Sequence, residues 1–105
     1  MGITEALAVA ALAEAFNVPV ALHLGVGLGI YIAAGIHTAA AIPNLLTMEY
    51  QPTQFAIAQS LLTTELPVDA DGYRVPEGPG LGVEIDLEAL APHIVDSFTL
   101  TVADQ

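Results

Sequence analysis

The feature that most limits how this chain can fold is its long uncharged stretch, since no Asp, Glu, Lys or Arg occurs between Glu14 and Glu49. Residues 24–42 alone could cross a bilayer, for which about 20 apolar residues suffice. Glycines and a histidine interrupt this window, however, prolines stand at its edges, and no Lys, Arg or Trp flanks it as an interfacial anchor. The stretch therefore favours the buried elements of a globular domain, with a membrane hairpin as the alternative.

Apolar periodicity divides the stretch into alternating helices and strands. Residues 3–17 are rich in alanine and leucine, which predicts a helix with Thr4 as its N-cap. Residues 18–23 form a short, continuously apolar run, as expected for a parallel strand buried on both faces. After a glycine-rich turn, a second helix is predicted over 28–42 and a second buried strand over 45–49. This order is typical of α/β proteins with parallel strands.

The chain changes character near residue 66. Residues 66–105 are rich in Gly, Pro and Asp, and they contain two short β-like runs around turn signals before a weak helix that begins near Asp86. We therefore expect two parts, a βα part over 1–65 and an irregular cover segment over 66–105.

Composition excludes several classes of function in a chain of 105 residues, the length of one small domain. Twelve acidic residues stand against one basic residue, Arg74, and the net charge of −11 argues against nucleic acid as a partner. The acidic surface predicts a salt-adapted protein, with an ordinary acidic chain as the alternative. The absence of cysteine excludes disulfides and thiolate sites, and the lack of a basic export signal favours a cytoplasmic location.

Two polar residues stand at the carboxyl ends of the predicted strands. His23 ends the first apolar run and Glu49 ends the second. Because βα barrels assemble their chemistry at this end, the two side chains could face one pocket mouth. From their positions alone, His23 could equally be a residue that only ends a strand, and Glu49 one that only meets solvent.

The other motifs give weaker signals. The glycines of Gly25-x-Gly27-x-Gly29 do not have the G-x-G-x-x-G spacing of a dinucleotide-binding turn, so no nucleotide site is expected. His37 lies among alanines of the second predicted helix, where a packed or surface histidine is more common than a ligand. His93 lies in the acidic tail with no partner nearby in the sequence. No metal-ligand motif occurs in the chain.

Three segments of the sequence carry a family resemblance. They are GITEALAVAALAEAFNVPVALH, AAAIPNLLTMEYQP and LPVDADGYRVPEGPGLGVEIDLEAL, in this order. Together they resemble the carboxyl-terminal portion of the mandelate racemase/muconate lactonizing enzyme family of the enolase superfamily. The resemblance implies a modified (β/α)7β TIM-like barrel, of which this chain would hold about two βα units. It also implies a magnesium-dependent enzyme that removes the proton beside a carboxylate.

The resemblance gives roles to both strand-end residues. His23 is similar to the histidine that ends the seventh barrel strand and acts as a general acid/base, for which the ordinary histidine pKa of about 6.5 is suitable. Glu49 is similar to the eighth-strand glutamate that hydrogen-bonds the substrate carboxylate. To donate such a bond, Glu49 would keep its proton, which burial could arrange by raising its pKa.

The function implied by the resemblance is that of a sugar-acid dehydratase acting on gluconate, xylonate or galactonate, in a parent enzyme that is a homo-oligomer. A racemase or epimerase is the alternative within the family, and a non-catalytic remnant is the alternative outside it. The acidic Mg²⁺ ligands, the lysine base and the aspartate that orients the histidine belong to earlier strands of the family. The chain alone is therefore expected to be inactive.

Overall fold

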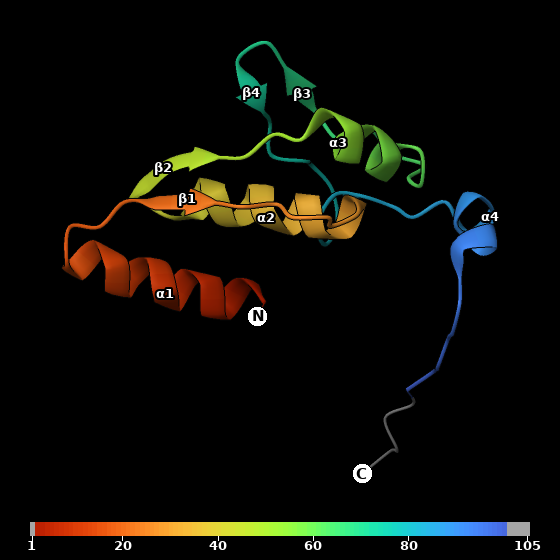
Figure 1. Ribbon diagram of the computed structural model, residues 1–105, viewed down its shortest axis with the longest axis horizontal. Helices are drawn as coiled ribbons and strands as arrows, with labels where there is room; N and C mark the ends of the chain where they lie inside the picture. Colours follow the sequence, from red (N-terminus) through yellow and green to blue (C-terminus); the bar gives the residue numbers. More distant parts are fainter. Residues whose placement is uncertain (1, 101–105) are drawn as a thin grey trace.

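Helices and short strands alternate over the first half of the chain, as the sequence predicts. The computed structural model describes residues 2–100 (Figure 1). Its elements in chain order are α1 (Ile3–Ala15), β1 (Val20–Leu22), α2 (Gly29–Ala41), β2 (Leu45–Met48), α3 (Pro52–Gln59), β3 (Val68–Asp69), β4 (Gly72–Tyr73), α4 (Leu87–Leu90) and a 3-10 helix (Ala91–His93). The order α1–β1–α2–β2 confirms the predicted α/β class.

The two strands of the βα part lie side by side and run parallel, as Figure 1 shows. Ala21 pairs with Thr47 and Leu22 with Met48, after a register irregularity next to Val20. Among residues 2–100, β1 and β2 pair only with each other, so both outer edges of this small sheet are free of a strand partner. Unpaired edges of this kind are open to further strands.

The ends of the first helix and strand differ from the prediction. α1 begins where predicted, but Gly2 is its N-cap and no side chain caps it, so the assignment of Thr4 as N-cap is wrong. The carbonyl of Gly2 accepts a hydrogen bond from the Ala6 N–H at 3.0 Å, which places Thr4 inside the first turn. After the helix, Asn17 adopts a left-handed φ of 54°, a conformation that asparagine tolerates. This turn delays the start of β1 to Val20.

One helix was not predicted. Residues 50–65 contain α3, which begins with Pro52 in its first turn. Proline is favoured there because the first helical N–H groups have no partner within the helix. Pro52 is therefore the local signal that could have found α3. Ala58 on this helix is fully buried in the core.

The hydrophobic core is small and lies around α2. Its buried members come from the loop after β1, from α2, from α3 and from the loop after α3, and they are Leu24, Ile32, Ala33, Ile36, Ala58 and Leu66. A Cβ added at Gly29 would lie 2.6 Å from the Leu62 side chain, so the first turn of α2 approaches the loop after α3 closely. The core thus joins the βα part to the segment that follows it.

Residues 66–100, for which an irregular cover segment is expected, pack against the core formed by α2 and α3. β3 and β4 form an antiparallel hairpin, which confirms the two short β-like runs. Further along, the Asp86 N–H donates to the Leu61 carbonyl at 3.0 Å, and the Thr63 N–H donates to the Glu84 carbonyl at 3.0 Å. The Asp86 side chain caps α4 by accepting from the Glu88 and Ala89 N–H groups, so the predicted helix start near Asp86 is confirmed.

The strands are less buried than the sequence predicts. Ala21 is exposed, while Val20 and Leu22 on the other face of β1 are half-buried, so burial on both faces is wrong for the described residues. Large apolar side chains are also exposed near the sheet, including Leu46 at 68%. Within residues 2–100, no helix has the length and apolar character needed to cross a bilayer.

Two glycines of the cover allow a matched test of its packing. Gly80 and Gly82 both have left-handed φ angles, but a Cβ at Gly82 would lie 2.9 Å from Pro76, whereas one at Gly80 would meet nothing within 4 Å. Gly80→Ala should cost about 1–2 kcal/mol of unfolding free energy from backbone strain. Gly82→Ala should cost about 1–3 kcal/mol more because of the added clash. Urea midpoints measure both, and equal losses would contradict the packing described.

Candidate catalytic site at the strand ends

The two strand-end residues predicted from the sequence lie side by side. The Glu49 N–H donates to the Leu22 carbonyl at 2.9 Å, which extends the parallel pairing past the end of β2. Because side chains alternate along a strand, this register brings His23 and Glu49 together. The imidazole Nδ1 of His23 lies 2.5 Å from Oε2 of Glu49, and the two side chains are 74% and 37% exposed. The structure thus places a carboxylate and an imidazole in direct contact.

Glu49 is held in its ionised form. A side-chain hydrogen bond with Gln51 is the main cause of a pKa below the ordinary value of 4.5. Burial, the second-largest effect, raises the pKa of Glu49, and the Leu24 N–H and the nearby His23 lower it. The Leu24 N–H donates to Oε2 at 3.1 Å. Burial does raise the pKa of Glu49, but the expectation that its pKa is raised overall is wrong, because the effects of Gln51, Leu24 and His23 together outweigh burial.

The contact sets the arrangement of protons on His23. A carboxylate can only accept hydrogen bonds, so Nδ1 of His23 carries the proton that faces Glu49. The second ring nitrogen, Nε2, then remains to take up or give a proton at the exposed side of the ring. An imidazole oriented by a carboxylate in this way is suited to general acid/base chemistry.

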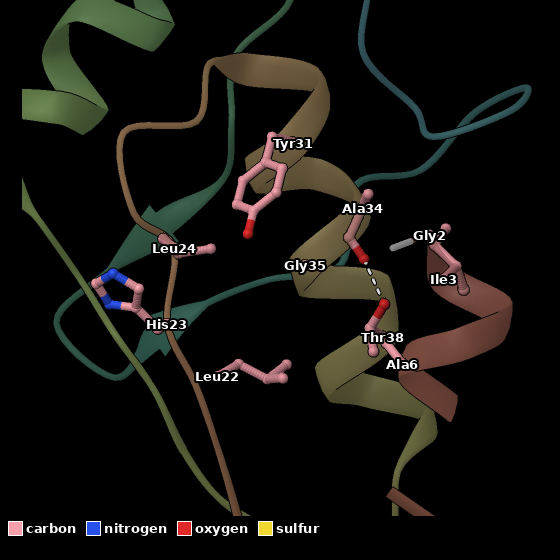
Figure 2. A pocket seen from close by; sticks show the side chains of 10 residues that line it. All are labelled: Gly2, Ile3, Ala6, Leu22, His23, Leu24, Tyr31, Ala34, Gly35 and Thr38. Atoms are coloured by element: carbon pink, nitrogen blue, oxygen red, sulfur yellow. Dashed lines mark hydrogen bonds between the residues drawn. The ribbon is translucent and has the colours of Figure 1, made fainter. Parts of the chain in front are cut away.

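A cavity of about 310 Å³ lies between α1, β1 and α2, and His23 is among the residues that line it. Figure 2 shows Leu22, Leu24 and Tyr31 directed toward the space in front of α2, whereas the imidazole is on the opposite side of the strand. The alternation of side chains along β1 explains this division. The cavity therefore lies mainly on the helix-covered face, whereas the His23 ring is turned to the other side of the strand, where it contacts Glu49.

The match to a protein family covers most of the chain. A family model described as enolase C-terminal domain-like matches residues 1–90. The chain belongs to the enolase C-terminal domain-like family. This membership confirms the resemblance carried by the three sequence segments.

Individual members of the enolase superfamily are similar over nearly the whole chain. The D-xylonate dehydratase of Haloferax volcanii is 36% identical over 99 residues, which are 94% of this chain and 24% of that protein. The chloromuconate cycloisomerase of Pseudomonas putida is 34% identical over 89 residues, or 85% of this chain and 24% of that protein. Both dehydratases and cycloisomerases are thus found among its relatives.

The fold is also similar to a solved structure. A member of the enolase superfamily from Agrobacterium tumefaciens superposes with a TM-score of 0.78 at 33% identity, covering 86% of this chain and 23% of that one. The arrangement of helices and strands is accordingly that of the enolase-superfamily α/β fold. The chain spans about a quarter of the length of these relatives.

Enolase-superfamily members generally use Mg²⁺, yet the residues at the strand ends do not fit this ion. Mg²⁺ prefers an octahedral set of oxygen ligands, and Glu49 is the one carboxylate of the pair, already bonded to Leu24 and His23. In the part of the chain that the structure describes, no group of three or more His, Asp or Glu side chains could hold a metal ion.

His37, Gly25 and Gly27 are explained by packing and by turn geometry. Nε2 of His37 lies 3.1 Å from the Leu81 carbonyl and joins α2 to the cover segment, whereas His93 is exposed in the 3-10 helix. Gly25 has a left-handed φ of 53°, and a Cβ at Gly27 would lie 2.1 Å from the Tyr31 ring. Glycine at these two positions is explained by the tight turn into α2.

Sequence reasoning missed two residues that contact Glu49. Gln51 bonds its carboxylate, and the Tyr73 hydroxyl donates to its backbone carbonyl at 3.4 Å. Gln51 stands two residues away along the chain, so its closeness to Glu49 was a possible local signal. Tyr73 is 24 residues away and comes from the β3–β4 hairpin, so no local pattern indicates the contact.

Proposed function

We propose that the chain provides the His23–Glu49 acid/base pair of a sugar-acid dehydratase. The observation that carries the proposal is the 2.5 Å contact between Nδ1 of His23 and the ionised Glu49 carboxylate at adjoining strand ends. Similarity to a D-xylonate dehydratase over 94% of the chain supports the substrate class. A polyhydroxy carboxylate of this kind is the proposed partner.

In the proposed reaction, water leaves a sugar acid. The proton on the carbon beside the carboxylate goes to a base outside this chain, and the electron pair of that C–H bond forms a C=C bond as the neighbouring hydroxyl departs. His23 gives its Nε2 proton to that hydroxyl, which leaves as water, and the enol product becomes a 2-keto-3-deoxy acid. Glu49 holds the Nδ1 proton of His23 and stabilises the imidazolium before the transfer.

The activity belongs to a longer assembly than this chain. The chain spans 24% of the related D-xylonate dehydratase, and within residues 2–100 the outer edges of β1 and β2 have no strand partner. His23 is 74% exposed, although a proton-transfer site works best where water is excluded. We propose that the complete protein covers this face and supplies Mg²⁺ and the base.

The test is a hybrid in which residues 2–100 replace the matching quarter of the D-xylonate dehydratase. With D-xylonate, formation of a 2-keto-3-deoxy acid, detected as its semicarbazone, is the expected result. A folded hybrid that binds D-xylonate without turnover would favour a non-catalytic module.

A racemase or cycloisomerase is the second candidate, favoured by the similarity to a chloromuconate cycloisomerase over 85% of the chain. In that reaction the same imidazole would return a proton to carbon, and the substrate would keep its hydroxyl groups. Exchange of the α-hydrogen with solvent deuterium, without formation of a keto acid, distinguishes this candidate from the dehydratase.

We further propose that the protein works at high salt, because its net charge of −11 causes a self-repulsion that salt screens. Raising KCl from about 0.1 M to about 1 M shortens the Debye length from about 10 Å to about 3 Å. The midpoint of helix melting should then rise by about 4–8 °C, the shift that about 1 kcal/mol produces in a domain of this size. NaCl at the same ionic strength should give a rise of similar size, because screening depends on ionic strength and not on the identity of the cation, and a rise confined to KCl would contradict electrostatic screening.

A further inference from the structure

The β3–β4 hairpin reaches back to the carboxyl end of β2 through Tyr73. The Tyr73 hydroxyl donates to the backbone carbonyl of Glu49 at 3.4 Å. Its ring also contacts Tyr50 and Phe55, with centroids 5.8 Å and 6.1 Å away. The Tyr50 and Phe55 rings lie 5.4 Å apart. Tyr73 therefore joins the Glu49 carbonyl to a cluster of three aromatic rings.

These contacts fix the backbone of Glu49 on both sides. Its N–H donates to the Leu22 carbonyl at 2.9 Å within the parallel pairing, but β2 ends one residue earlier, at Met48. Beyond that point Tyr73 holds the Glu49 carbonyl. The peptide groups before and after the Glu49 Cα are thus both hydrogen-bonded. This holds the Glu49 carboxylate where it contacts the Leu24 N–H and Nδ1 of His23.

Hydrogen bonds and an ion pair stabilise the β3–β4 hairpin. The Arg74 N–H donates to the Pro67 carbonyl at 2.9 Å, and the Arg74 guanidinium lies 2.7 Å from the Asp69 carboxylate. Asp69 also accepts from the Asp71 N–H at 2.9 Å. Burial, with the nearby Tyr50 and Glu49, raises the pKa of Tyr73 to about 12. The hydroxyl therefore keeps its proton at neutral pH and can act as a donor.

We propose that Tyr73 is a positioning residue, whose hydroxyl and ring hold the Glu49 peptide and thereby orient the carboxylate that contacts the His23 imidazole. The catalytic meaning of this role rests on the proposed function, whereas the geometric role does not. Tyr73 thus fixes the geometry at the carboxyl end of β2, although it lies far from that strand in the sequence.

The Leu24 N–H is the natural probe, because its hydrogen bond ends on the Glu49 carboxylate. Its rate of hydrogen–deuterium exchange in the 105-residue chain can be read at single-residue resolution, without any need for activity. Tyr73→Phe keeps the ring and removes the hydroxyl. We expect Leu24 exchange to become about 2- to 10-fold faster, the effect of losing one hydrogen bond, while the amide of Ile36 in α2 changes less than about 2-fold.

Tyr50→Phe is the matched control, because it removes a hydroxyl from the same aromatic group without touching a described hydrogen bond of Glu49. It should leave Leu24 exchange unchanged. The proposal is overturned if Tyr73→Phe does not alter Leu24, if Leu24 is unprotected in the unaltered chain, or if Leu24 and Ile36 accelerate together. The last result would make Tyr73 a support of the whole core. Failure of the proposed function would show in the hybrid assay and would leave these exchange rates unaffected.

Discussion

Replacing His23 with asparagine is expected to lower turnover by about 10²–10⁴-fold in the hybrid with the D-xylonate dehydratase, the range for losing a positioned acid/base group. The asparagine amide can still hydrogen-bond the Glu49 carboxylate, but it cannot transfer a proton. The loss should therefore appear in kcat more than in KM. Initial rates of keto-acid formation measure it.

His37→Asn is the matched control for this change. His37 lies on α2, and its Nε2 contacts the Leu81 carbonyl, away from the strand ends. Turnover should stay within about 2-fold of the unaltered hybrid, because no proton-transfer group is lost. Losses of similar size at His23 and His37 would mean that His23 has only a structural role.

Replacing Glu49 with glutamine should lower turnover less, by about 10–100-fold, the effect typical of removing a carboxylate that orients an imidazole. The glutamine oxygen can still accept the Nδ1 proton of His23 but brings no negative charge to stabilise the imidazolium. Glu88→Gln on α4 makes the same change of net charge away from the site and should leave the rate unaltered. A loss at Glu49 as large as that at His23 would contradict an orienting role.

The lowered pKa of Glu49 also predicts how the stability of the folded chain changes with pH. Because Gln51, Leu24 and His23 favour the ionised form in the folded chain, the stabilisation is fully present above the ordinary pKa and is lost as pH falls through the lowered value. Unfolding midpoints of the unaltered chain should therefore fall more steeply below about pH 4.5 than those of Glu49→Gln. Parallel pH profiles for the two chains would contradict the assigned shift.

The family, the α/β class and the order of the first four elements could be predicted from the sequence. These features depend on local patterns. Apolar periodicity separates α1 from β1, glycines mark the turn into α2, and Asp86 shows where α4 begins. The residue types at the two strand ends likewise identified His23 and Glu49 as candidates, because parallel strands carry their carboxyl ends to one edge of a sheet.

The protonation of Glu49, the orientation of the His23 ring and the contact with Tyr73 depend on the tertiary structure. Whether Glu49 holds a proton depends on how burial balances the donors that meet it, and one of them, the Leu24 N–H, lies 25 residues away along the chain. The parallel register of β1 and β2 also brings the His23 ring against Glu49, and folding of the β3–β4 hairpin brings Tyr73 to the Glu49 carbonyl. Sequence periodicity reports which face of an element is apolar, but pKa values and distant hydrogen bonds depend on which groups the completed fold places within a few ångströms of each other.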